Sequence, residues 1–454
     1  MAKENKKAAL SMEERLDAAL VPDWEQPYKV PANWCWTTVG AINKYVGSSV
    51  DPLVNPDTIF ELYSVPSSVE DYPEIVKGAE IGSTKQRVKK GDVLLCKINP
   101  RINRVWRVSQ HTQYLSIASS EWIVVRNEAI SSHYLMWYMR SEAFRDYMLS
   151  NVSGVGGSLM RAQPKYVQGY PVPLPPLAEQ QRIVDRIESL FAKLDEAKEK
   201  AQAVVDGYDA RRAAILHKAF TGELTEKWRS VRGVKTDSWL NTDLSHSVLS
   251  FKYGTSEKSA YENTGMPVFR IPNVTDLGLS FEDLKYLPHD DIPYESQIHE
   301  NEILIIRSNG SRDLVGKSVL VPHLDQQYAY ASFLIKAVPA KMIDPAFLVY
   351  YLNSADARNQ MFKKAKSTAG INNINSKELG EITISIPPLQ EQAEIVSILG
   401  KLLEGEMQTV ETAKKAVGKI EQMKKAILAR AFRGKLGTND PTDEIAEELL
   451  MRVL

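Results

Sequence analysis

The chain contains an internal repeat whose second copy begins 212 residues after the first. Residues 175–184 read Pro-Pro-Leu-Ala-Glu-Gln-Gln-Arg-Ile-Val, and residues 387–396 read Pro-Pro-Leu-Gln-Glu-Gln-Ala-Glu-Ile-Val. The same offset, without a gap, relates residues 214–224 to residues 426–436, where Ala-Ile-Leu, Ala-Phe and Gly recur. A repeat of this kind indicates two structurally similar halves.

Both copies carry apolar residues in alternating steps of four and three, a pattern typical of helices that pair along a seam. The Pro-Pro pair suits a helix start, and the glycine after each Ala-Phe suits a helix end, so each helix should run about 60 Å. Glu406 and Thr409 interrupt the second seam. A plain structural coiled coil is one interpretation, but the matched lengths favour two helices that pack against each other with approximate two-fold symmetry and each close one half. The predicted seam and partner-binding residues are Ile183, Ile187, Leu190, Leu194, Ile395, Leu399, Leu402 and Ile420.

The segments that precede the helices, residues 23–174 and 237–386, are rich in Pro, Gly, aromatic and β-branched residues. Short apolar runs in them, such as residues 92–98 and 302–307, predict strands. One helix is predicted in each half, over Tyr134 to Met148 and over Pro345 to Phe362. The predicted fold class is therefore α+β, with two repeated domains that are each followed by a long helix.

The composition is that of an ordinary folded protein, with 43% hydrophobic and 25% charged residues in 454. No apolar run is long enough for a membrane helix, and no signal peptide is recognisable, so we expect a cytoplasmic protein that does not contact a membrane. Cys35 and Cys96 have no neighbouring Cys or His, which predicts buried thiols and no metal site. The net charge of −1 means that any nucleic-acid surface must be local.

Two windows supply such local charge. Residues 85–107 contain eight cations and one acid, and residues 358–377 contain five cations, no acid and four asparagines. Lys and Arg neutralise phosphates, while Arg and Asn pair with base edges, although a solvated surface is the alternative explanation. Gly-containing loops at residues 151–161 and 367–375 would let backbone approach phosphate closely. The candidate DNA-binding residues are Lys85, Arg87, Lys97, Arg101, Arg104, Arg107, Arg161, Arg307, Asn309, Arg312, Lys364, Asn372 and Asn373.

A near match to a phosphate-binding P-loop occurs at residues 310–318, ending in Gly316, Lys317 and Ser318. It has one residue too many, and residues 318–321 predict a strand where a P-loop opens a helix. A nucleotide-hydrolysing enzyme that uses Lys317 is thus a weaker alternative. No Ser-His-Asp or Cys-His grouping stands out, so we predict that the chain has no catalytic residues.

Two α+β halves, each closed by a Pro-Pro-Leu-x-Glu-Gln helix that ends in Ala-Ile-Leu-x-x-Ala-Phe-x-Gly-x-Leu, resemble the specificity subunit of type I restriction–modification enzymes. Residues 253–256 and 267–274 add to this resemblance, which covers nearly the whole chain. The four segments would be a first target-recognition domain (1–174), a central spacer helix (175–225), a second target-recognition domain (226–386) and a C-terminal spacer helix with its tail (387–454).

The resemblance implies a non-catalytic subunit that binds double-stranded DNA at a split, asymmetric site, one half per domain. It also implies that the two helices pair as an antiparallel coiled coil, set the gap and dock two methyltransferase subunits, which methylate adenine at N6. Restriction and translocase subunits would join them. S-adenosylmethionine, ATP and Mg²⁺ would lie on those partners and none in this chain. A coiled-coil scaffold without DNA specificity is the alternative.

Overall fold

The computed structural model describes residues 11–153, 160–235, 238–262, 265–288, 292–368 and 370–454. It divides into two compact units. Unit 1 comprises residues 1–201 and 415–454, and unit 2 comprises residues 202–414. Each unit therefore joins one sheet-rich half to parts of both repeated helical segments, and the predicted α+β class with two sheet-rich domains and long helices is confirmed.

Unit 1 is built on a three-stranded sheet in the order β7-β6-β9 and a five-stranded sheet in the order β2-β5-β8-β3-β4. Every side chain of the central strand β6 is buried, which accounts for its continuous apolar sequence. The strands are β1 (Cys35–Thr38), β2 (Ser49–Val50), β3 (Ile59–Tyr63), β4 (Glu74–Lys77), β5 (Lys85–Arg87), β6 (Val93–Cys96), β7 (Val105–Arg107), β8 (Leu115–Ala118), β9 (Trp122–Val125), β10 (Val152–Ser153), β11 (Arg161–Ala162) and β12 (Pro171–Leu174). The helices are α1 (Met12–Ala19), α2 (Val39–Ile42), α3 (Ser132–Met139), α4 (Glu142–Ser150), α5 (Pro164–Val167) and α14 (Ala446–Val453), with most of α6 (Leu177–Asp206) and the end of α13 (Leu389–Ala431).

Unit 2 repeats this plan with different detail. Its central strand β20 lies in a four-stranded sheet of order β14-β24-β20-β22, and a second sheet has the order β18-β15-β23-β19. The strands are β13 (Leu240–Asp243), β14 (Val248–Tyr253), β15 (Pro267–Phe269), β16 (Val274–Thr275), β17 (Gly278–Leu279), β18 (Lys285–Tyr286), β19 (Gln297–Ile298), β20 (Ile303–Ile306), β21 (Ser308–Asn309), β22 (Ser318–Leu320), β23 (Tyr328–Tyr330), β24 (Leu334–Pro339), β25 (Lys366–Thr368), β26 (Ile371–Asn373) and β27 (Thr383–Ile386). The helices are α7 (Tyr208–Phe220), α8 (Glu226–Arg232), α9 (Leu244–Ser247), α10 (Pro345–Leu352), α11 (Ala355–Lys364) and α12 (Ser376–Gly380), with the first part of α13.

The single helix predicted over Tyr134 to Met148, and that over Pro345 to Phe362, is wrong, because each segment forms two short helices, α3 with α4 and α10 with α11. Ser141 begins α4, and its side chain accepts a hydrogen bond from the amide of Phe144. Ser354 begins α11 in the same way and accepts from Ala357. A serine side chain at such a position satisfies the free amides of a new helix, so the chain can turn and start again.

The first long helix is also shorter than predicted, since α6 ends at Asp206 and α7 begins at Tyr208. Gly207 separates them, although its amide still bonds to Ala203 and its carbonyl accepts from Arg211. The second helix, α13, runs unbroken for 43 residues. Glycine is a poor helix residue, and here it leaves room for the guanidinium of Arg211, whose Nη1 would lie 2.6 Å from an added Cβ.

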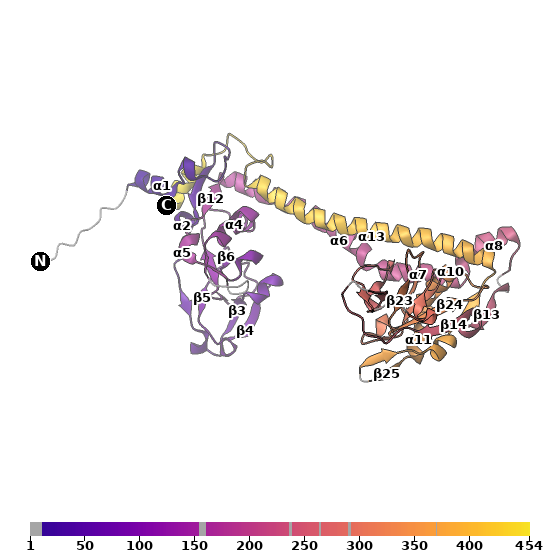
Figure 1. The fold of residues 1–454 in the computed structure, drawn as a ribbon. Helices are drawn as coiled ribbons and strands as arrows, with labels where there is room; N and C mark the ends of the chain where they lie inside the picture. Colours follow the sequence, from indigo (N-terminus) through magenta and orange to yellow (C-terminus); the bar gives the residue numbers. More distant parts are fainter. Residues whose placement is uncertain (1–10, 154–159, 236–237, 263–264, 289–291, 369) are drawn as a thin grey trace. The chain divides into compact units, whose positions relative to one another are not determined.

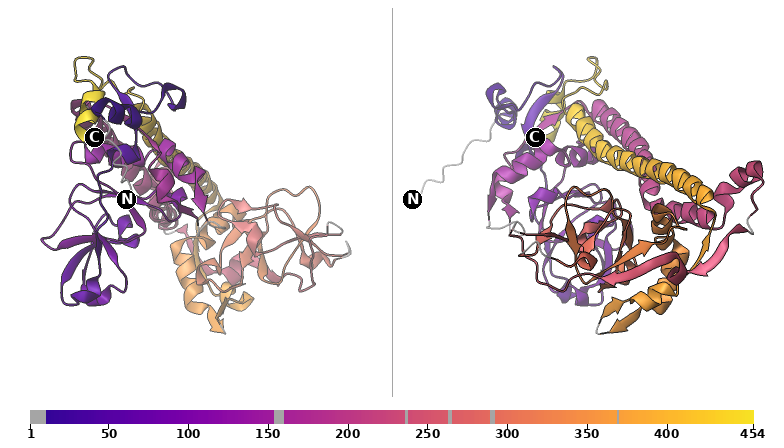
Figure 2. Two further views of the ribbon diagram at one scale, coloured as in Figure 1. Left: turned by 90° about the vertical axis from the view of Figure 1, so that its left-hand side faces the viewer. Right: turned by 45° about the vertical axis from the view of Figure 1, so that its right-hand side comes forward.

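The helices pair antiparallel within each unit. In unit 1, Lys198 of α6 bonds to Glu421 of α13 at 2.5 Å, and Figure 2 shows the two helices side by side. In unit 2, Arg211 of α7 donates to Glu406 of α13 at 2.7 Å. Glu406, which interrupts the apolar seam, is thus half of an ion pair between the helices.

The C-terminal helix α14 completes unit 1. Its residues Ala446, Leu449, Leu450 and Val453 are buried in the same core as the start of α6. The helix lies beside α1, close to the point marked C in Figure 1. Within the described residues, no helix is both long and apolar enough to cross a membrane.

Candidate nucleic-acid interface

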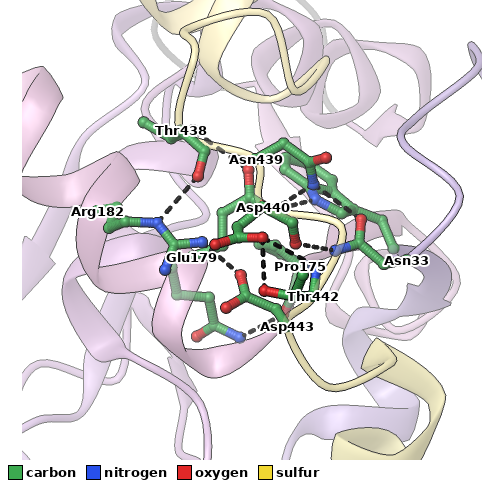
Figure 3. Close-up of polar contacts among 11 residues, drawn as sticks. Asn33, Pro175, Glu179, Arg182, Thr438, Asn439, Asp440, Thr442 and Asp443 are labelled. Carbon is green, nitrogen blue, oxygen red and sulfur yellow. Dashed lines mark hydrogen bonds and ion pairs between the residues drawn. The ribbon is translucent and has the colours of Figure 1, made fainter.

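The Glu-Gln pair that opens each repeated helix is fully buried, which explains why the sequence repeats it. In unit 1, Glu179 accepts hydrogen bonds from Trp34 Nε1 at 2.7 Å and from Asn439 Nδ2 at 2.8 Å. Thr438 donates to its other oxygen at 3.2 Å, so the segment after α13 folds back onto the start of α6 (Figure 3). Arg182, one turn on, donates to the Thr438 carbonyl.

Unit 2 uses the equivalent carboxylate with a charged partner. Glu391 accepts from Trp239 Nε1 at 3.1 Å, from Thr225 at 2.7 Å and from Arg229 Nη1 at 2.6 Å. Both members of the Arg229–Glu391 ion pair are buried. Here the segment after α7 reaches the start of α13, so each helix end is fastened to the start of the other helix.

The glutamine beside each of these carboxylates fastens the helix to the domain. Gln180 accepts from the amide of Ser131 at 2.9 Å, just before α3, and Gln392 accepts from the amide of Asp344 at 2.6 Å, just before α10. Each amide group also donates to the carbonyl of the first proline, Pro175 or Pro387. These contacts are structural, and they hold the two domains in the same relation to their own helices.

In unit 2, three of the predicted DNA-binding residues lie on one small sheet, and they are Asn309, Asn372 and Asn373. The strands β21, β26 and β25 form it, and Asn309 pairs with Asn372 in the antiparallel register. The amide of Ile374 donates to the carbonyl of Arg307 at 2.9 Å, which fixes the end of β20 against this sheet. Figure 1 shows β25 on the side of unit 2 opposite α13.

Arg307 is held in one orientation. Its guanidinium lies 4.6 Å from the ring centroid of Tyr253, and its Nε and Nη2 each lie 3.3 Å from Asn373 Oδ1. Tyr253 is fixed in turn, because its hydroxyl accepts from the amide of Ser376 at 3.0 Å. Tyr253 is absent from the predicted set, although its segment is part of the family resemblance. An arginine held by stacking retains donors that can reach a base edge.

Unit 1 places a different set at the equivalent position. The amide of Ala162 donates to the carbonyl of Lys97 at 2.8 Å, just as Ile374 does to Arg307. Arg161, next to Ala162 on β11, lies 3.2 Å from Glu121, and Lys97 lies 4.0 Å from the same carboxylate. At matching points of the shared scaffold, unit 1 thus presents Lys97 with Arg161. Unit 2 presents Arg307 with Asn373.

The other predicted residues lie outside these two matched pairs. Arg107 donates to Ser132 at 2.8 Å, at the start of α3. Lys364 is paired with Glu381, and Arg312 donates to the carbonyl of Phe362. The remaining residues are Lys85 and Arg87 on β5, Arg101 and Arg104 in the loop between β6 and β7, and Asn309 and Asn372 on the small sheet of unit 2. Of the glycine loops, residues 154–159 and 369 lie outside the described part of the chain.

Some of the predicted seam residues lie in the domain cores, and the others lie along the paired helices. Four are fully buried in the domain cores, Ile420 is buried, Leu190 and Leu194 are partly buried, and Leu402 is 41% exposed. The four core residues are Ile183, Ile187, Ile395 and Leu399. In the described residues, no group of three or more His, Cys, Asp or Glu side chains could hold a metal ion. Lys317, the lysine of the near P-loop, is paired with Asp276 and is followed by strand β22.

Comparison with known proteins identifies the class. Residues 246–417 match the family model of the type I restriction modification DNA specificity domain. The chain is 28% identical over 309 residues to the type I restriction enzyme EcoKI specificity subunit of Escherichia coli K12, and 25% identical to the StySPI specificity subunit of Salmonella potsdam. Each match covers 68% of this chain and 66% of the relative, so the aligned part falls just short of two thirds of these relatives.

Solved structures agree on the fold. The HsdS subunit from Thermoanaerobacter tengcongensis superposes with a TM-score of 0.62 at 22% identity, covering 91% of this chain and all of that one. A chain from a study of complex assembly and conformational transition of the type I R-M system gives 0.73 at 22% identity, covering 90% and 100%. Residues 246–417 thus match a type I restriction modification DNA specificity domain, and the chain as a whole is similar to the specificity subunits of type I restriction enzymes.

Proposed function

We propose that the chain is the non-catalytic, cytoplasmic DNA-recognition subunit of a type I restriction–modification complex, and that it reads a split, asymmetric site with one half per unit. The observation that carries this proposal is the matched placement of Lys97 with Arg161 and of Arg307 with Asn373. A scaffold shared by two domains, with different polar side chains at one position, suits the reading of two different short sequences.

The same proposal assigns partners to the chain. The paired helices and nearby domain surfaces dock two methyltransferase subunits, and restriction and translocase subunits associate with that complex. S-adenosylmethionine, ATP and Mg²⁺ belong to those partners, which methylate adenine at N6 and cleave DNA. This proposal gives the near P-loop lysine no role, because strand β22 follows Lys317 where a P-loop opens a helix.

The experiment that tests this proposal is methylation mapping by long-read sequencing. DNA from cells that express the chain with its methyltransferase subunit is compared with DNA from cells that express the methyltransferase alone. We expect a split motif that carries N6-methyladenine only when the chain is present. If both chains are expressed and associate but no motif appears, the chain is a scaffold without DNA specificity.

A further inference from the structure

A cavity of about 450 Å³ opens in unit 1 between α4, the end of α13 and the loop that precedes β7. Four cationic side chains line it, and Glu142 is the one acid among the described residues that do so. Two apolar side chains, Val69 and Ile102, stand at the cavity and are 75% and 52% exposed. The four cations are Arg104, Arg140, Arg145 and Lys425.

The arginines are held in place by the fold. Arg140 donates from Nε and Nη2 to the carbonyl of Val105, at 3.2 and 2.9 Å, and keeps its Nη1 donors. Burial lowers the pKa of Arg140 from its ordinary value, an effect that nearby Asp71 partly offsets. The Nε of Arg145 is buried and has no hydrogen-bond acceptor within the described part of the chain.

Glu142 does not neutralise this group of charges. Its Oε1 lies 2.7 Å from Lys425 and 3.7 Å from Arg145, and its side chain is 48% exposed. Three positive charges remain when the lining residues are summed. Like charges that converge on one cavity repel each other, and an anion bound there would relieve the repulsion and supply acceptors to buried donors.

We infer that this cavity is a phosphate-binding site. Guanidinium groups match phosphate oxygens in a two-pronged geometry, and the ammonium of Lys425 adds a point charge at the rim. The shared ligand chemistry is a phosphate ester, whose source is either a free phosphorylated compound or the backbone of bound DNA. The inference does not rest on the proposed function, because it concerns binding that can be measured without DNA.

Calorimetric titration of the full chain with inorganic pyrophosphate tests the inference. We expect one site whose affinity falls about tenfold or more in the double variant Arg104→Gln, Arg145→Gln, since each change removes a charge-assisted contact. Lys425→Gln should weaken binding less, because Glu142 already shares that ammonium. Arg186→Gln, an exposed change on α6, is the matched control and should bind like the unaltered chain. Thermal unfolding of every variant checks that it is folded.

Competition with a duplex of unrelated sequence distinguishes the two sources. Displacement of pyrophosphate by the duplex, with weaker duplex binding by the double variant, assigns the site to backbone phosphate. Pyrophosphate that stays bound beside the duplex assigns it to a free phosphorylated compound. The inference is overturned if pyrophosphate does not bind, or if folded double variant and control bind it equally.

Discussion

At the scale of single residues, Glu179 and Glu391 have the same structural role, but their buried partners differ in charge. Glu179 is surrounded by the neutral donors of Trp34, Thr438 and Asn439, whereas Glu391 also faces the buried guanidinium of Arg229. Removing the charge of Glu391 therefore strands a buried cation, which removal of the charge of Glu179 does not do.

We predict that Glu391→Gln costs about 3–5 kcal/mol of unfolding free energy and that Glu179→Gln costs about 1–3 kcal/mol. Denaturant unfolding of the full chain measures both, with hydrogen exchange of peptides from each unit separating the two losses. Arg229→Met added to Glu391→Gln should recover part of the loss, since no buried charge then remains. Equal losses in the two single variants would contradict this account.

A second buried carboxylate makes unit 1 sensitive to acid. Burial raises the pKa of Glu61, but hydrogen bonds from Tyr63, from Thr112 and from the amide of His111 outweigh it and hold the pKa below its ordinary value of 4.5. A lowered pKa contributes stability above pH 4.5 that is lost as the pH falls through the folded value. We predict that, as the pH falls below 4.5, unit 1 loses more stability in the unaltered chain than in Glu61→Gln. Parallel pH profiles of the two proteins would refute this account.

At the scale of elements, the sequence repeat predicts more than local patterns do. Strands β6 and β20 were expected from short apolar runs and are confirmed, because buried strands read as continuous apolar sequence. The break at Gly207 was not expected, since the apolar pattern continues across it. The contact between Tyr253 and Arg307 could not be predicted either, because 54 residues separate the two and only the folded sheet brings them together.

The paired helices provide a test of the spacer proposal. Residues 201–202 and 414–415 mark the boundaries between the two compact units, so insertions there alter helix length and leave both cores intact. A heptad inserted at both places should lengthen the tolerated gap in the DNA site by about three base pairs. Seven residues add about 10.5 Å of helix, and each base pair takes up about 3.4 Å of duplex. A heptad in only one helix should disrupt the pairing and abolish methylation. Methylation mapping reads the gap directly, and an unchanged gap after matched insertion would refute the spacer role.

At the scale of the whole molecule, the central claim is that two equivalent surfaces read two independent half-sites. The most direct measurement is methylation mapping of two variants expressed with the methyltransferase subunit. One is Arg307→Gln with Asn373→Ala in unit 2, and the other is Lys97→Gln with Arg161→Gln in unit 1. We predict that each variant loses base discrimination in one half of the split motif only, and that the affected half differs between them. If both variants alter the same half, or if neither alters the motif while both proteins remain folded and associated, the claim is contradicted.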